Sequence, residues 1–207
     1  MNIIQLPLGP LETNCYVLAN DLKEVLIFDP GEEAFEIFDV IEENQYKPLA
    51  ILLTHAHFDH IGALDEVRDK YNIPVYLHEN EKDFLADSTK NGSVLFLRRE
   101  VFAKEADHLI SKEGKIEIGN FTLSIFETPG HSPGSVSYYV KDAKSVFSGD
   151  ALFCQGIGRT DLPGGDHDTL IKSIKSKLFS LPENTRVYSG HGPETSIQYE
   201  KKHNPFL

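Results

Sequence analysis

Short apolar runs alternate with amphipathic segments along the first part of the chain. Runs with alternating or continuous apolar character predict strands. The predicted strands are Ile3–Leu8, Asn14–Leu18, Val25–Phe28, Leu49–Leu53 and Val75–Leu77. Between them, apolar side chains recur at helical spacing over residues 34–41 and again over residues 61–67. This part therefore begins with strands and continues with strands and helices in alternation.

The second part of the chain repeats this alternation. Gly119 with Asn120, and Lys141 with Asp142, are turn signals between apolar runs, and each pair predicts a hairpin. The predicted strands are Lys115–Ile118, Phe121–Phe126, Ser135–Val140, Ser145–Ser148 and Arg186–Ser189. A helix is predicted over residues 170–178, where apolar side chains again recur at helical spacing.

Residues 79–112, between these two blocks, have no regular pattern, and we expect a surface excursion with short helical pieces there. Each block supplies strand pairs followed by helices, which is typical of two sheets packed face to face with helices outside. A chain of 207 residues can form one large domain or two small ones. It contains no clear linker, so we expect a single domain over residues 1–207.

Composition narrows the possible functions. The net charge of −12 argues against a protein that binds nucleic acid by neutralising phosphates. Two cysteines, Cys15 and Cys154, are too few for a disulfide framework and favour a reducing compartment. The first residues lack the pattern of a signal peptide, and no apolar run approaches the roughly 20 residues of a membrane helix. We therefore expect a cytoplasmic protein that binds neither nucleic acid nor membranes.

The strongest chemical signal lies in Thr54–His60, which carries three imidazoles and one carboxylate directly after the apolar run Leu49–Leu53. Imidazole and carboxylate are good ligands for divalent zinc, iron or manganese. A buried strand would hold such a cluster rigidly at its end. The segment therefore predicts a metal site, which becomes a metallo-hydrolase site if later residues complete the ligands.

Candidate ligands also follow three later predicted strands. They are His131, Asp150 and His191, and each comes directly after a glycine. Glycine allows a sharp turn and a close approach of the backbone. One histidine at a strand end is an ordinary loop residue, but four strand ends that deliver His or Asp indicate a metal centre. The remaining histidines lack motif context and are expected on the surface or in loops: His78, His108, His167 and His203.

The His-X-His-X-Asp-His cluster, followed by His, Asp and His at glycine turns, resembles the metallo-β-lactamase superfamily over essentially the whole chain. The resemblance implies an α+β fold, the four-layer αββα sandwich. It also implies two divalent metal ions, with zinc preferred and iron or manganese as alternatives. The implied ligands are His55, His57 and His131 for the first metal, Asp59, His60 and His191 for the second, and Asp150 for both.

Segments around these ligands narrow the resemblance to one branch. Thr128–Ser135, Ser148–Phe153 and Gly156–Asp161 resemble glyoxalase II, the hydroxyacylglutathione hydrolases. Residues 190–207 resemble the ending of the short, single-domain bacterial members. The resemblance implies hydrolysis of a small acyl-thiol, such as a 2-hydroxyacyl thioester, by a hydroxide that bridges the two metals. Asp59 is then the catalytic residue that orients this hydroxide, besides binding a metal.

Two departures from the two-domain members of this branch leave the thiol open. The C-terminal helical domain that helps those enzymes to hold glutathione is expected to be absent, and Asp161 stands where they have a tyrosine. Arg159 keeps the basic residue of the glycine-rich loop and is a candidate to bind a substrate carboxylate. A structural salt bridge between Arg159 and Asp161 explains the residue at least as well.

Three alternative functions fit part of the pattern. A mononuclear-iron persulfide dioxygenase also resembles the chain at Gly158–Asp161, but it needs one metal, and the full ligand set favours two. Another hydrolase of the same fold is the second alternative: a lactonase, a β-lactamase or a nuclease. The missing signal peptide argues against a secreted β-lactamase, and the acidic charge against a nuclease. A binding module with a decayed site conflicts with the intact ligands. The sequence does not predict the oligomeric state.

Overall fold

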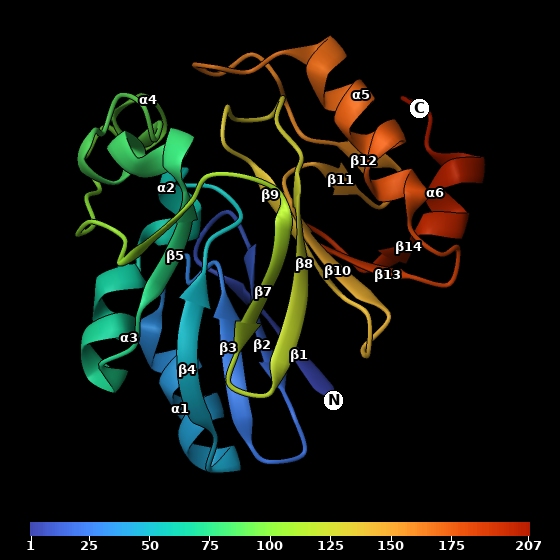
Figure 1. Ribbon diagram of the computed structural model, residues 1–207. Coiled ribbons are helices and arrows are strands. Elements are labelled where there is room, and N and C mark those ends of the chain that lie inside the picture. Colours follow the sequence, from blue (N-terminus) through green and yellow to red (C-terminus); the bar gives the residue numbers. More distant parts are fainter. The chain divides into compact units, whose positions relative to one another are not determined.

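The computed structural model describes residues 1–207, which form two compact units (Figure 1). Unit 1 comprises Met1–Ser111 and Glu117–Phe121, and unit 2 comprises Lys112–Ile116 and Thr122–Leu207. The structure contains two six-stranded sheets, one formed by the strands of each predicted block. The prediction of two successive blocks, each with its own sheet, is therefore confirmed.

The first sheet has the strand order β1-β2-β3-β4-β5-β6. These strands are β1 (Asn2–Leu8), β2 (Thr13–Ala19), β3 (Glu24–Phe28), β4 (Lys47–Leu52), β5 (Val75–His78) and β6 (His108–Ile110). The first three pair antiparallel, whereas β3 to β6 pair parallel. Because parallel strands in one sheet end at the same edge, β3, β4 and β5 deliver the residues that follow them to one place.

Helices connect these parallel strands, as the crossover of a parallel pair requires. They are α1 (Ala34–Asn44), α2 (Phe58–Ile61) and α3 (Leu64–Tyr71), followed by the 3-10 helix η1 (Glu79–Ala86) and by α4 (Ser93–Leu97). The predicted face of α1 is confirmed, since Ala34, Ile37 and Ile41 are buried. α1 contacts α3, and their apolar faces share one core with alternate residues of β2 to β5 (Figure 1).

The segment from residue 79 to 112 differs in part from its prediction. It contains short helical pieces, as expected, but it also adds β6 to the edge of the sheet beside β5. Glu81 and Asn91 are fully buried rather than exposed at the surface. His78, expected on the surface or in a loop, is the last residue of β5 and is buried. The reason is that the carboxyl end of β5 lies inside the unit, beneath η1.

The second sheet has the strand order β14-β13-β10-β9-β8-β7. These strands are β7 (Gly114–Ile118), β8 (Phe121–Glu127), β9 (Val136–Val140), β10 (Ser145–Gly149), β13 (Arg186–Ser189) and β14 (Thr195–Ser196). β9 pairs antiparallel with both β8 and β10, and β10 pairs parallel with β13. β8, β10 and β13 therefore run in the same direction and end at the same edge.

Unit 2 also contains elements that the sequence pattern did not predict. β11 (Leu152–Phe153) and β12 (Gly156–Ile157) form a separate small hairpin. The helix α5 (His167–Ser176) and the 3-10 helix η2 (Leu178–Ser180) match the predicted helix, whereas α6 (Ile197–His203) is additional. Apolar residues of α5 and α6 share one core with residues of β10 and β13. No helix in the structure has the length and apolar character that a membrane crossing needs.

A buried carboxylate in α6 fixes the β11–β12 hairpin. The side chain of Glu200 accepts hydrogen bonds from the Gln155 backbone N–H at 3.0 Å, from Asn204 Nδ2 at 2.8 Å and from Thr195 Oγ1 at 2.6 Å. Asn204 Nδ2 also lies 3.0 Å from the Gly156 carbonyl oxygen, to which it donates. The C-terminal helix therefore holds the hairpin that comes directly after the predicted ligand Asp150.

We predict that Glu200→Ala lowers the free energy of unfolding by about 3 kcal/mol, because three donors lose a buried charged acceptor. Urea denaturation followed by circular dichroism measures this change. Lys202→Ala, at an exposed position of the same helix, is the control and should change the stability by less than about 0.5 kcal/mol. Equal stabilities of the two variants would contradict the role given to Glu200.

Candidate metal centre

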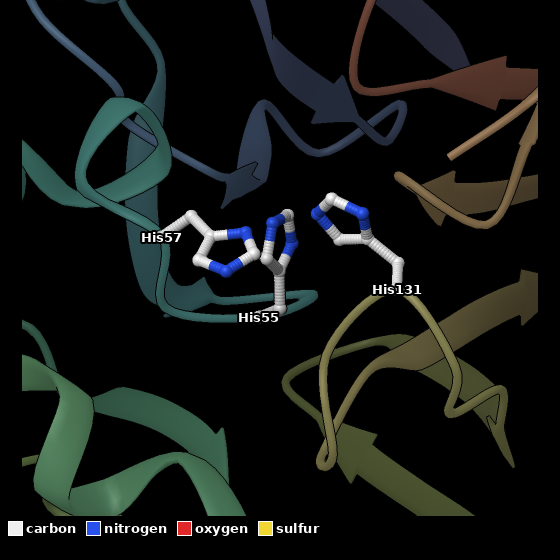
Figure 2. A group of neighbouring side chains, drawn as sticks. All are labelled: His55, His57 and His131. Carbon is white, nitrogen blue, oxygen red and sulfur yellow. The ribbon is translucent and has the colours of Figure 1, made fainter. Parts of the chain in front are cut away.

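His55 and His57 project from the loop that follows β4 (Figure 2). Both are buried, with exposed fractions of 0% and 4%. Their rings meet edge to face, with centroids 4.8 Å apart, and their potential ligand atoms lie within 4.8 Å of one another. A loop that leaves a buried strand thus presents two imidazoles in one place, as the sequence predicts.

Asp59 and His60 lie on the short helix α2, directly after this loop. His60 is fully buried, and its Nε2 lies 3.6 Å from Asp59 Oδ2. Asp59 Oδ2 also accepts a hydrogen bond of 2.8 Å from Thr13 Oγ1 of β2. The ligand atoms of His60 also lie within 4.8 Å of those of His55. Unit 1 therefore brings its four predicted ligands together.

Asp29, which follows β3, is a functional residue that the sequence analysis missed. Its Oδ1 accepts the Thr54 backbone N–H at 2.7 Å, and its Oδ2 accepts the Thr54 hydroxyl at 2.6 Å. The same Oδ2 lies 3.1 Å from His60 Nδ1. Asp29 is buried and has a φ of 48°, in the left-handed region. An aspartate before Pro30 at the end of a buried strand is the sequence signal that could have revealed it.

These contacts determine which imidazole nitrogen is available to a metal. The Thr54 hydroxyl donates to Asp29, so at 3.1 Å it accepts from His55 Nδ1. His60 Nδ1 lies 3.1 Å from Asp29 Oδ2, at ion-pair distance. Because its Nδ1–H is engaged by Thr54, His55 keeps its lone pair on Nε2, which is the usual arrangement for a metal ligand.

Unit 2 brings the three later candidates together around Asp150. Asp150 Oδ2 lies 3.5 Å from His131 Nε2 and 3.5 Å from His191 Nε2. His131, on the turn after β8 (Figure 2), directs its Nδ1 at the Arg159 carbonyl oxygen, 2.8 Å away. Its Nε2 is therefore the nitrogen with the lone pair. His131 and Asp150 are buried, whereas His191 is partly exposed.

Two glycines are needed for this arrangement. Gly130 has a φ of 130°, and a Cβ there would lie 2.3 Å from the Leu170 backbone nitrogen. A Cβ on Gly158 would lie 1.8 Å from the Asp150 carbonyl oxygen. The expected role of Gly130 in a tight turn before His131 is thus confirmed. Gly158 has the same importance for the close approach of the glycine-rich loop to Asp150.

Arg159 forms a two-pronged ion pair with Asp161. Its Nε donates to Asp161 Oδ1 at 2.7 Å, and its Nη2 donates to Asp161 Oδ2 at 2.8 Å. The Arg159 side-chain hydrogen bond lowers the pKa of Asp161 to about 2. The structure thus shows the salt bridge that was one of the two interpretations of Arg159, and both side chains are largely exposed.

The donor sets of the two units fit divalent metal ions. Among the predicted ligands, unit 1 offers three buried imidazoles and unit 2 offers one. His55 and His131 each have Nδ1 in a hydrogen bond, and in each unit a carboxylate lies within 3.6 Å of a histidine Nε2. Neutral imidazole and carboxylate are the ligands that zinc, iron and manganese share. Buried imidazoles and carboxylates at the carboxyl ends of strands define the class of this protein as a metal-binding α+β protein.

A sequence model of the metallo-beta-lactamase superfamily matches residues 8–191. The chain therefore belongs to the metallo-β-lactamase superfamily, and it has the fold that its sequence motifs implied. The matched range contains all the ligands predicted from the sequence, from His55 to His191. The chain is a metallo-hydrolase of this superfamily.

Curated relatives match the chain over nearly its full length. It is 60% identical over 203 residues to "Probable metallo-hydrolase YqgX" of Bacillus subtilis strain 168, an alignment that covers 98% of this chain and 96% of the relative. It is 38% identical over 209 residues to "Hydroxyacylglutathione hydrolase GloC" of Haemophilus influenzae, covering 100% and 98% of the two chains.

Solved structures agree with this assignment. The crystal structure of the BLEG-1 B3 metallo-beta-lactamase is 57% identical, with a TM-score of 0.98, and the match covers 100% of this chain and 99% of the other. TTHA1623 in a di-iron-bound form is 36% identical, with a TM-score of 0.85, covering 99% and 100%. ETHE1 from Myxococcus xanthus is 29% identical, with a TM-score of 0.82, covering 99% and 84%.

We predict that Asp29→Asn weakens the binding of a metal at His60 by about 10–100-fold, because the neutral amide removes the negative charge that lies 3.1 Å from His60 Nδ1. Asparagine tolerates the left-handed backbone of this position, so the fold should persist. Titration with zinc against a chromogenic chelator measures the affinity.

Asp142→Asn, at an exposed turn, is the matched control and should bind metal like the unaltered protein. An unchanged zinc affinity in Asp29→Asn would show that the carboxylate does not act on the ligand.

Proposed function

We propose that the chain is a binuclear metallo-hydrolase that cleaves thioesters of small 2-hydroxy acids, as glyoxalase II does. The observation that carries the proposal is the full-length similarity to the relative named hydroxyacylglutathione hydrolase, together with the intact set of ligand positions. Residues 1–207 would act as one hydrolase domain, since the family match extends across both units.

The proposed metal ligands follow the family pattern. His55, His57 and His131 would hold one ion, Asp59, His60 and His191 would hold the other, and Asp150 would serve both. Two zinc ions are the preferred pair, with iron or manganese as alternatives, and the di-iron form of TTHA1623 supports iron as one of them. Bound divalent ions supply two kinds of chemistry: they lower the pKa of water to about 7 and polarise a carbonyl oxygen.

Asp59 is proposed to orient the attacking water. The Thr13 hydroxyl donates to Asp59 Oδ2 at 2.8 Å and so fixes the carboxylate in one rotamer. A carboxylate held in this way can accept a hydrogen bond from water and direct one oxygen lone pair at the thioester carbonyl carbon. The C–S bond then breaks, and the products are a carboxylic acid and a thiol.

One of the comparisons favours another reaction strongly enough to be tested beside thioester hydrolysis. The similarity to BLEG-1, whose structure is described as a B3 metallo-beta-lactamase, favours β-lactam hydrolysis. The mononuclear-iron persulfide dioxygenase, suggested by Gly158–Asp161, is tested as well, although the full ligand set favours two metals. Thioester hydrolysis remains the first choice because the relative named hydroxyacylglutathione hydrolase is similar over the full length of the chain.

We also propose a cytoplasmic location and a small-molecule acyl-thiol substrate. Cys15 and Cys154 are both free thiols, which suits a reducing compartment. Burial raises the pKa of the Cys15 thiol well above its usual value, and the nearby Asp29 raises it further. This thiol therefore stays neutral and unreactive, as a buried core cysteine does.

We predict that His57→Ala and Asp150→Ala each lower thioester turnover by at least about 100-fold, about 2.7 kcal/mol of transition-state stabilisation. The measurement uses zinc-reconstituted protein and a panel of thioesters, a β-lactam and a glutathione persulfide with oxygen consumption. Circular dichroism checks that each variant is folded.

His203→Ala, at an exposed histidine, is the control and should keep full activity. Full activity in His57→Ala or Asp150→Ala would refute the proposed centre. Turnover of the β-lactam or the persulfide without thioester hydrolysis would replace the proposed substrate class.

For Arg159, we predict that Arg159→Ala raises the KM for a 2-hydroxyacyl glutathione thioester several-fold with kcat nearly unchanged, because a carboxylate contact is lost. Asp161→Asn should lower this KM, since it releases the guanidinium from its ion pair. The ratio between the KM of each variant and the KM of the unaltered protein should stay the same from about pH 5 to 9. The reason is that the pKa of Asp161, lowered to about 2, keeps the ion pair charged over this range.

A thioester without carboxylates is the control substrate, and its KM should not respond to either change. If both variants bind the anionic and the neutral thioester like the unaltered protein, Arg159 has only a structural role.

A further inference from the structure

Glu81 is a fully buried carboxylate on η1, whose other buried residues, Phe84 and Leu85, are apolar. It lies on η1, directly after β5, and its exposed fraction is 0%. The residues on either side, Glu79, Asn80, Lys82 and Asp83, are all exposed. Burying one carboxylate of this segment costs free energy unless the group makes specific contacts, so its inward position requires an explanation.

The side chain of Glu81 reaches the peptide between two predicted ligands. Its Oε2 accepts a hydrogen bond of 3.1 Å from the backbone N–H of Ala56. Ala56 is fully buried and stands between His55 and His57 in the chain. The contact bridges the carboxyl ends of β4 and β5, which lie at the same edge of the parallel sheet.

A second residue of η1 contacts the same loop. The ring of Phe84 lies one helical turn after Glu81, and its centroid is 6.2 Å from that of the His57 imidazole. η1 therefore contacts the loop in two places: Glu81 binds its backbone at Ala56, and Phe84 lies against the ring of His57. Glu81 fixes the orientation of the peptide, and Phe84 limits the positions open to the His57 ring.

We propose that Glu81 is a positioning residue for the metal ion held by His55 and His57. A charged acceptor in a water-free environment binds a peptide N–H more strongly than a neutral one. Fixing the Ala56 peptide fixes the Cα positions from which both imidazoles project. The negative charge also favours a dication at the neighbouring imidazoles. This inference rests on the proposed assignment of both histidines to one metal.

The test measures metal affinity and coordination rather than turnover. Glu81→Gln keeps the shape of the side chain but removes its charge, and we expect it to weaken zinc binding by about 10–100-fold. Cobalt substituted into the same protein should show an altered visible absorption spectrum, because the imidazoles no longer hold one fixed geometry. Glu79→Gln is the matched control, the same substitution at an exposed position of the same helix.

A double-mutant comparison separates positioning from a general effect on folding. In a His57→Ala background, Glu81→Gln should weaken zinc binding much less than it does alone, because one of the ligands that Glu81 positions is gone. Equal effects in both backgrounds would show that Glu81 acts on stability alone. If Glu81→Gln fails to fold, Glu81→Asp, which keeps the charge but shortens the reach, takes its place in the same comparison.

The outcomes distinguish this inference from the assignment on which it rests. If His57→Ala loses zinc affinity but Glu81→Gln binds zinc with unchanged affinity and an unchanged cobalt spectrum, the positioning role is wrong and the metal assignment stands. If His57→Ala also binds zinc normally, the assignment fails and the role of Glu81 fails with it. Weak binding in both single variants, with a reduced effect in the double variant, supports the proposal.

Discussion

The carboxylate of Asp29 is the contact on which the ligand cluster of unit 1 depends. It accepts both the backbone N–H and the hydroxyl of Thr54, at 2.7 and 2.6 Å, and lies 3.1 Å from His60 Nδ1. One short side chain can reach these groups because β3 and β4 are neighbouring parallel strands that end together. Because the Thr54 hydroxyl donates to this carboxylate, it can only accept from His55, so the proton of the His55 ring is on Nδ1. One buried acid therefore fixes the tautomer of His55 and also faces the imidazole of His60.

Both units use strand direction to gather ligands. In each sheet, strands that run the same way end at one edge, and the residue types that bind metals follow those ends. The residues so delivered are Asp29, His55 and Glu81 after β3, β4 and β5, and His131, Asp150 and His191 after β8, β10 and β13. Loops at such an edge do not need the apolar residues that the strands need. Polar side chains can therefore gather in these loops without weakening the core.

The sequence predicted the long buried strands because a strand covered on both faces is continuously apolar, as Val25–Phe28 of β3 is. It missed β6, β11, β12 and β14, which have two or three residues each and are too short to show a period. It missed α6 because its buried positions include the carboxylate Glu200 beside Ile197. The predicted ligands stood out by residue type and spacing. Asp29 and Glu81 did not, because a single acid in a turn after a strand or among other charged residues looks like a surface residue until the fold is known.

Buried charge explains why these two acids suit a metal centre. A carboxylate taken out of water is costly, and hydrogen bonds from Thr54 and Ala56 offset part of that cost for Asp29 and Glu81. The two carboxylates still place negative potential near the imidazoles, which are neutral when they bind metal. A dication at those imidazoles is attracted by both acids, whereas an anion is repelled. The acids that orient the ligands therefore also select the charge of what the ligands bind. A carboxylate-bearing substrate would then need a bound metal to offset the same potential.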